Sequence, residues 1–213
     1  MRKDPVERRN EILDAADELF SIKGYDGTST SDILEKVGIA RGTLYHHFKS
    51  KENIMDALIE RYGLRLLGAA KAIAADKRLP VDERIIRTVM SMKISGGSSQ
   101  EIMEHIHKPQ NALMHQKIQK LIINGLTPIM AGIIIEGVEQ GLFETPYPYQ
   151  CTEMLVTYAN IVFDDDLVDM TNEERDVRMQ AFIFNAERML GVKSGSLMHI
   201  IQMFGHQPDG VND

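Results

Sequence analysis

The chain has 213 residues, 43% of them hydrophobic, enough to bury a core without the help of metals or disulfides. Its single cysteine, Cys151, excludes an intrachain disulfide framework and fits a reducing compartment. The formal net charge of −7 is unexpected for a nucleic-acid-binding protein, so the distribution of charge matters more than its sum.

The charge is unevenly distributed along the chain. Residues 1–51 carry nine Lys or Arg and nine Asp or Glu, so the whole negative excess lies in residues 52–213. The electrostatic field at the binding surface, rather than the net charge of the whole chain, decides whether a protein binds phosphate. The N-terminus leads directly into a charged helix, and the longest apolar run, 129–135, is too short to span a bilayer. We therefore expect a cytoplasmic protein with no secretory signal and no membrane span.

The first predicted helix begins at Asp4, which can cap it, with Pro5 in its first position, and ends at Gly24. Its apolar residues follow helical spacing and form one inward stripe: Ile12, Ala15, Ala16, Leu19 and Phe20. This helix can supply the core that short helices after it need.

Two short helices follow, joined by a tight turn. Thr30 or Ser31 can cap the first, which runs to about Val37, and Gly38 ends it. The second runs from about Arg41 to Phe48. Short helices joined by a three- to four-residue turn containing glycine form a helix-turn-helix.

The second short helix has only Leu44 and Phe48 on its inward face. The consecutive Tyr45, His46 and His47 cannot all point inward from one short helix, although a buried cluster with satisfied histidines is the alternative. Hydroxyl, imidazole and guanidinium groups suit phosphates and base edges. Ser50 can cap a further helix, which places Lys51 beside free backbone N–H groups as a phosphate anchor.

The run from Gly38 to Lys51, GIARGTLYHHFKSK, resembles the DNA-binding domain of tetracycline-repressor-like (TetR-family) transcriptional regulators. The resemblance implies a helix-turn-helix domain over 1–51 and a helical effector-binding and dimerisation domain over 52–213. It also implies that nine residues approach the major groove or its phosphates: Thr30, Ser31, Arg41, Gly42, Thr43, Tyr45, His46, His47 and Lys51.

Helical patterns fill the rest of the chain, and no segment alternates as a strand does, so the predicted fold is all-α. The further helices expected are 51–75, one from Pro80 to before Gly96, one from Ser98 to about His107, and one from Pro109 to near Gly141. In the last of these, Thr127-Pro128 either kinks the helix, which we favour, or starts a new one. Two more helices are expected over 148–165 and over 172–190, the second with a capping box at Thr171–Glu174 and a stop at Gly191.

The helix 148–165 has almost no polar face, so it needs cover on all sides. A second chain is the expected cover, and the interior of a monomer is the alternative. The family resemblance likewise implies a four-helix interface between two subunits. The residues predicted for it are Leu155, Ala159, Val162, Met179, Phe182, Ile183, Ala186 and Leu190.

The resemblance further implies a pocket for an unknown small-molecule effector. The residues that could line it are Tyr62, Leu66, Met90, Met103, His107, Met114 and Tyr158, each of which could instead be ordinary core. Thirteen methionines and no tryptophan suggest a soft, adaptable interior.

Catalytic and metal-binding patterns are missing from the sequence. Glu104-x-x-His107 is a single element, whereas a di-iron bundle needs two such elements and two further glutamates. We expect no enzyme activity, no metal and no cofactor. The sequence predicts a ligand-responsive repressor that binds a palindromic operator as a homodimer. The alternative is a ligand-independent or architectural DNA-binding protein of the same fold.

Overall fold

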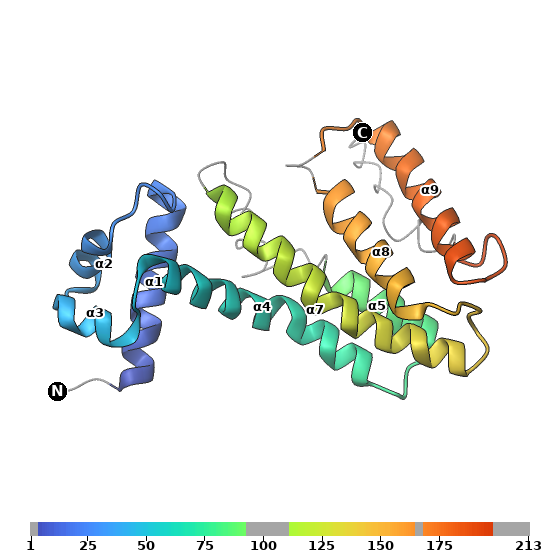
Figure 1. The fold of residues 1–213 in the computed structure, drawn as a ribbon, viewed down its shortest axis with the longest axis horizontal. Coiled ribbons are helices and arrows are strands. Elements are labelled where there is room, and N and C mark those ends of the chain that lie inside the picture. Colours follow the sequence, from blue (N-terminus) through green and yellow to red (C-terminus); the bar gives the residue numbers. More distant parts are fainter. Residues whose placement is uncertain (1–3, 93–110, 165–167, 198–213) are drawn as a thin grey trace, which may run out of the picture. The chain divides into compact units, whose positions relative to one another are not determined.

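The computed structural model describes residues 4–92, 111–164 and 168–197. Every regular element within these ranges is a helix, which confirms the predicted all-α class (Figure 1). The helices are α1 (Pro5–Lys23), α2 (Thr30–Val37), α3 (Arg41–His47), α4 (Lys51–Ala75), α5 (Val81–Met92), α7 (Ala112–Glu139), α8 (Pro148–Val162) and α9 (Asn172–Met189).

The chain forms two compact units, and α4 and α7 each contribute one end to each unit. Among the residues that the structure describes, those within 1–68 and 93–121 form the first unit, and those within 69–92 and 122–213 form the second. The predicted division at residue 51 is neither confirmed nor excluded by these units and stays a prediction.

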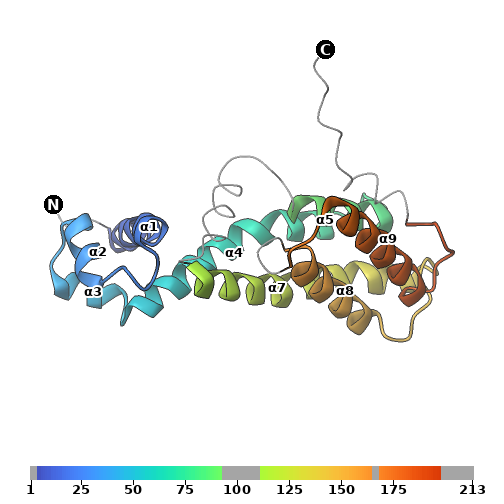
Figure 2. The same ribbon diagram turned by 90° about the horizontal axis from the view of Figure 1, so that it is seen from above.

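In the first unit α1 has the predicted ends. The Asp4 carboxylate accepts a hydrogen bond from the Val6 N–H at 2.8 Å, and Gly24 follows the last turn with φ of 75°. Its inward stripe is buried, with Ile12, Ala16 and Phe20 fully inaccessible to solvent. Figure 2 shows α1, α2 and α3 gathered around the start of α4.

The helix α2 begins one residue earlier than predicted. Its cap is Ser29, not Thr30 or Ser31: the Ser29 hydroxyl accepts from the Asp32 N–H at 3.1 Å. The Asp32 carboxylate in return accepts from the Ser29 N–H at 2.7 Å. Gly38 ends the helix in the left-handed conformation (φ 70°, ψ 42°), as predicted.

The long helices keep the predicted limits at one end or both. The helix α4 starts after Ser50, whose hydroxyl accepts from the Asn53 N–H at 3.1 Å, and ends at Ala75. Pro128 lies inside α7, which continues as one helix from Ala112 to Glu139. The predicted short helix from Ser98 to about His107 lies outside the described residues.

Of the described helices, α7 has the length and apolar composition that could cross a membrane, by these two criteria alone. A third of its most apolar window (33%) is buried within the protein, and the core helix of a soluble protein meets the same criteria.

The second unit has an apolar core drawn from α5, α7, α8, the segment between α7 and α8, and the end of α9. Its buried members are Val81, Met130, Ile133, Ile134, Phe143, Val156 and Leu190. A Cβ atom at Gly137 would lie 2.4 Å from the ring of Phe143, so the ring packs directly on the α7 backbone there.

The helices α8 and α9 run side by side in both views (Figures 1 and 2). The helix α8 ends at Val162, three residues before the predicted end at 165, and Phe163 caps it. The predicted capping box of α9 is confirmed, because Thr171 and Glu174 exchange two hydrogen bonds of 2.8 and 3.2 Å.

Candidate nucleic-acid interface

The helix α3 is held to the first unit by two side chains and presents the others to solvent. Leu44 is 0% and Phe48 4% exposed, as their inward positions predicted. Arg41, Gly42, Tyr45 and His46 are exposed, and Thr43 and His47 are half-buried. The short helix therefore has one anchored face and one polar face that a partner can reach.

The side chain of Tyr45 is oriented by its neighbours on two helices. The Arg41 guanidinium lies 5.5 Å from the centroid of the Tyr45 ring. Hydrogen bonds from Arg41 and then from Thr30 lower the pKa of the Tyr45 phenol. Because Thr30 is the first residue of α2, its hydrogen bond joins the start of α2 to Tyr45 of α3, and the next residue along α2, Ser31, is exposed.

His46 and His47 form an edge-to-face pair with ring centroids 5.2 Å apart. Burial, followed by the positive charges of His46, Arg8 and Arg9, lowers the pKa of His47. These effects favour the neutral form of His47, whose ring offers one hydrogen-bond donor and one acceptor.

Arg8 and Arg9 of α1 were not predicted as site residues, yet they lie near the end of α3. The Arg9 guanidinium is 5.2 Å from the centroid of the Phe48 ring, and both arginines act on His47 electrostatically. Only tertiary structure brings the start of α1 to this position. The sequence signal was no more than two adjacent arginines in a neutral segment.

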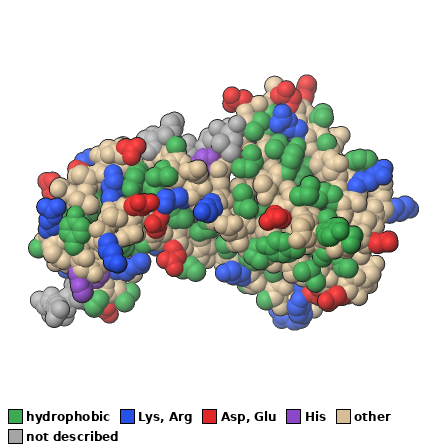
Figure 3. Space-filling view, in the orientation of Figure 1, with side chains coloured by type: hydrophobic (Ala, Val, Ile, Leu, Met, Phe, Trp, Pro, Cys, Tyr) green, Lys and Arg blue, Asp and Glu red, His purple; other side chains and the backbone are tan. Residues whose placement is uncertain are grey.

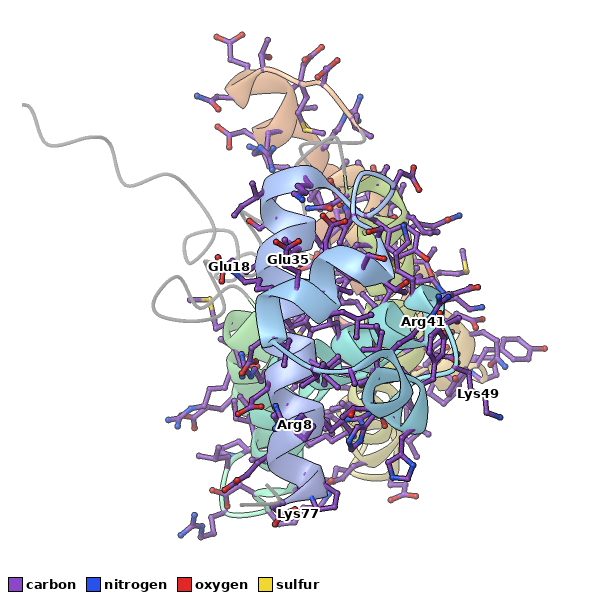
Figure 4. The ribbon with its side chains drawn as sticks, turned by 90° about the vertical axis from the view of Figure 1, so that its left-hand side faces the viewer. Arg8, Glu18, Glu35, Arg41, Lys49 and Lys77 are labelled. Atoms are coloured by element: carbon purple, nitrogen blue, oxygen red, sulfur yellow. The ribbon has the colours of Figure 1, made fainter. Side chains whose placement is uncertain are left out.

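Some charged side chains of the first unit are paired with each other, and others are not near an opposite charge of the set labelled in Figure 4. In Figure 4, Glu18 and Glu35 lie above Arg8, Arg41 and Lys49. Two lysines are already paired with acids: Lys36 with Glu18 at 2.5 Å and Lys23 with Asp32 at 2.6 Å. The hydrogen bond from Lys23 is the main cause that lowers the pKa of Asp32.

Lys51 has a different placement from the predicted free phosphate anchor. Its ammonium donates to the carbonyl oxygens of Tyr25 at 2.6 Å and Thr28 at 2.8 Å. It also lies 4.1 Å from the centroid of the Tyr25 ring. In this structure Lys51 fixes the loop between α1 and α2, because the loop carbonyls turn toward the start of α4.

The seven residues predicted for an effector pocket do not belong to one unit. Tyr62, Leu66 and Met114 are buried in the first unit, whereas Met90 and Tyr158 are exposed in the second. Met103 and His107 lie outside the described residues. The Tyr62 hydroxyl donates to Asp17 of α1, and burial is the main cause that raises the pKa of Tyr62. Tyr62 thus links α1 to α4.

The residues predicted for a dimer interface divide into two groups. Ile183, Ala186 and Leu190 are at most 5% exposed and face the interior of their own subunit, and their place in a dimer interface stays a prediction. The others are half-buried: Leu155, Ala159, Val162, Met179 and Phe182. Phe182 stacks on Tyr158 with centroids 5.7 Å apart.

The outward apolar surface of α8 agrees with the predicted lack of a polar face on this helix, whereas the outward apolar residues of α9 were not predicted. Met154 is 63%, Tyr158 42%, Val177 65% and Phe184 46% exposed. Val177, Ala181 and Phe184 follow helical spacing, which could have identified the outer face of α9. Figure 3 shows hydrophobic side chains gathered over these helices on the face in view.

Two family models match the chain. The model for "Bacterial regulatory proteins, tetR family" matches residues 12–58, and the model for "Tetracyclin repressor-like, C-terminal domain" matches 93–184.

The HTH-type transcriptional repressor KstR2 of Rhodococcus jostii is 41% identical over 68 residues, which is 32% of this chain and 33% of that protein. The chain thus matches about a third of that repressor's length. The fatty acid metabolism regulator protein of Bacillus subtilis is 29% identical over 133 residues, 62% of this chain and 68% of that protein.

Solved structures share the fold over most of the chain. A tetR-family regulatory protein from Rhodococcus RHA1 has a TM-score of 0.55 at 21% identity and covers 88% of this chain and 99% of its own. A TetR/AcrR-family regulator from Thermobifida fusca has a TM-score of 0.55 at 23% identity, with 84% and 97% covered. With both family models matched and the same helical fold, the chain belongs to the TetR family of bacterial transcriptional regulators.

Proposed function

We propose that the protein is a repressor that binds a palindromic operator as a homodimer, with α3 as its reading helix. The observation that carries this proposal is the outward polar face of α3. Arg41, Tyr45 and His46 are exposed while Leu44 and Phe48 fix the helix to its support. A guanidinium pairs well with guanine edges, and hydroxyl and imidazole groups bind phosphates or other base atoms.

Contacts to the DNA backbone fix the position of the reading helix. Thr30 and Ser31, both with hydroxyl side chains, lie in the first turn of α2. Arg8 and Arg9 add positive charge near the other end of α3. We assign these groups to phosphates, which orient the protein without reading the sequence.

The exposed apolar surface of α8 and α9 supports the homodimer. Four large hydrophobic side chains are exposed on these helices: Met154, Tyr158, Val177 and Phe184. Large apolar patches on soluble proteins mark interaction sites. A two-fold dimer would place two α3 helices in successive major grooves, about 34 Å apart.

A small-molecule effector of unknown identity would release the operator. The effector acts only if its affinity differs between the DNA-binding state and the other state. The ligand-independent alternative predicts that no compound both stabilises the protein and changes its affinity for DNA. The proposed location is the cytoplasm.

A salt titration of DNA binding tests the proposal. The probe is a duplex that the full-length protein enriches from a random-sequence pool, and fluorescence anisotropy gives the Kd. If a dimer neutralises six to ten phosphates, the affinity should fall about 10³- to 10⁵-fold between 50 and 200 mM salt. A protein that enriches no duplex, or whose affinity is independent of salt, would contradict the proposal.

A further inference from the structure

Within the described ranges, four side chains of the second unit have a buried polar atom without a hydrogen-bond partner: Arg84 Nε, Thr88 Oγ1, Thr127 Oγ1 and Asn160 Nδ2. Arg84, Thr88 and Thr127 are at most 2% exposed. A buried polar atom without a partner lowers the stability of the folded state, and native proteins keep few of them. Several such atoms in one unit therefore indicate a binding partner that is not part of the chain.

Two of these atoms lie on the side of α5 that faces α7. Arg84 and Thr88 are four residues apart, so they share one face of the helix. This face packs on α7, because Arg84 binds Glu136 there and Val81 lies 3.2 Å from the position of a Cβ atom at Gly137.

The other two atoms belong to α7 and α8 and border the apolar core of the second unit. Thr127 is three residues before Met130 on α7, and Asn160 is four residues after Val156 on α8. Each therefore shares a helix face with a buried core residue. The side chain of Met130 is flexible, so it can adapt to a ligand beside Thr127.

The chemistry of the unpaired atoms selects the ligand. Arg84 Nε and Asn160 Nδ2 can only donate hydrogen bonds, and a threonine hydroxyl can also donate, so the ligand must supply an acceptor oxygen. The charge of Arg84 is already balanced by Glu136, whose second cation, Lys77, is 65% exposed. A carboxylate would therefore place an unbalanced negative charge in the core, whereas a carbonyl oxygen would not.

We propose that these four polar groups form a binding site for an uncharged, mostly apolar small molecule that carries a carbonyl oxygen. The inference rests on the proposed function and names the chemical class of its effector. The carbonyl oxygen accepts hydrogen bonds from the unpaired donors, and the apolar body of the ligand lies against the core residues of α5, α7 and α8.

The first test asks whether the Thr88 hydroxyl lacks a partner in the free protein. Thr88→Val replaces this hydroxyl by a methyl group of similar size, so we expect the Tm of the full-length protein to rise by about 2–4 °C in calorimetry. Thr152→Val is the matched control. Thr152 is 3% exposed, but its hydroxyl donates to the Pro148 carbonyl at 2.7 Å, so this change should not raise the Tm.

The second test measures binding of the alkan-2-ones from 2-hexanone to 2-dodecanone by isothermal titration calorimetry. We expect the wild type and Thr152→Val to bind at least one of these ketones, and Thr88→Val to bind it about 5- to 10-fold more weakly. Carboxylates of the same chain lengths should bind more weakly than the ketones. The ketone that binds most tightly should also change the Kd of the wild type for the enriched duplex.

The site would be overturned if no ketone bound, or if Thr88→Val and the wild type bound with equal affinity. A lower Tm in Thr88→Val would also overturn it, because the hydroxyl would then have a buried water as its partner. Tighter binding of the carboxylates would overturn the ligand class, and an unchanged Kd for DNA would overturn the role as effector.

A second variant and a DNA control keep these outcomes separable. Should Thr88→Val fail to fold by circular dichroism, Asn160→Leu removes another unpaired donor and should weaken ketone binding to a similar extent. Failure of the proposed function is distinguishable, because the wild type would then enrich no duplex while still binding the ketone.

Discussion

Ser29 and Asp32 close the first turn of α2 through reciprocal hydrogen bonds, and this turn carries two of the proposed phosphate ligands. Removing the Ser29 hydroxyl leaves the Asp32 N–H without its cap. We therefore expect Ser29→Ala to lower the free energy of unfolding by about 1 kcal/mol, measured by urea denaturation. Ser31→Ala is the matched control, and an equal loss in both variants would show that the cap is misassigned.

His47 should make DNA binding depend on pH. Its pKa is lowered in the free protein by burial and by the charges of His46, Arg8 and Arg9, so its neutral form is favoured. A phosphate beside His47 in the complex should raise this pKa, so we expect binding to take up a proton and to become tighter as the pH falls.

The measurement is the Kd between pH 7.5 and 5.5 for the wild type and His47→Gln. We expect the variant to lose most of the pH dependence. An equal pH dependence in both proteins would assign the proton uptake to another group, such as His46.

Individual residues also show the limits of prediction from sequence. The run Thr28 to Ser31 offers four hydroxyls as caps, and only the position of Asp32, three residues after Ser29, selects one of them. Lys51 has the sequence context of a phosphate anchor, but the loop carbonyls that bind it are more than twenty residues away in the chain. Local patterns do not contain such long-range contacts.

At the scale of elements, Arg84 joins three helices of the second unit. This side chain of α5 is 1% exposed and donates to Glu136 of α7 at 2.5 Å and to the Ala74 carbonyl of α4 at 3.1 Å. Hydrogen bonds from Arg84 first, and then from Lys77, lower the pKa of Glu136 to about 2.

We expect Arg84→Met to cost about 2 kcal/mol or more in the free energy of unfolding, since it leaves a carboxylate and a helix-end carbonyl without their buried partner. Arg87→Met is the control, because Arg87 is 54% exposed. The pKa of Glu136 is depressed, so the difference from wild type should be full above pH 4.5 and shrink as the pH falls toward 2. Equal stabilities of the two variants in urea would contradict this role.

Helix limits were predictable because their signals are local. The caps Asp4, Ser50 and Thr171 and the glycine stops lie within a turn of the ends that they determine. Which face of α9 is buried was not predictable. Its inner and outer stripes are both apolar, so only packing within the subunit shows that Ile183 faces inward and Phe184 outward.

At the scale of the whole molecule, the outer surface of α8 and α9 should hold the dimer together. A charge placed in an apolar interface loses its hydration without gaining a partner. We expect Val177→Glu or Phe184→Glu to weaken dimerisation by about 2 kcal/mol, or roughly 30-fold, in sedimentation equilibrium. Leu64→Glu, at a residue that is 70% exposed on α4, should remain dimeric. Dimers of unchanged stability in all three variants would place the interface elsewhere.

The anisotropy measurement with Tyr45→Ala tests the central claim, that the outward face of α3 reads DNA, most directly. The account predicts that this variant loses binding to the enriched duplex while remaining dimeric in sedimentation and folded by circular dichroism, and that Leu64→Glu still binds. Wild-type affinity in Tyr45→Ala would contradict the account, because DNA would then be bound by another surface.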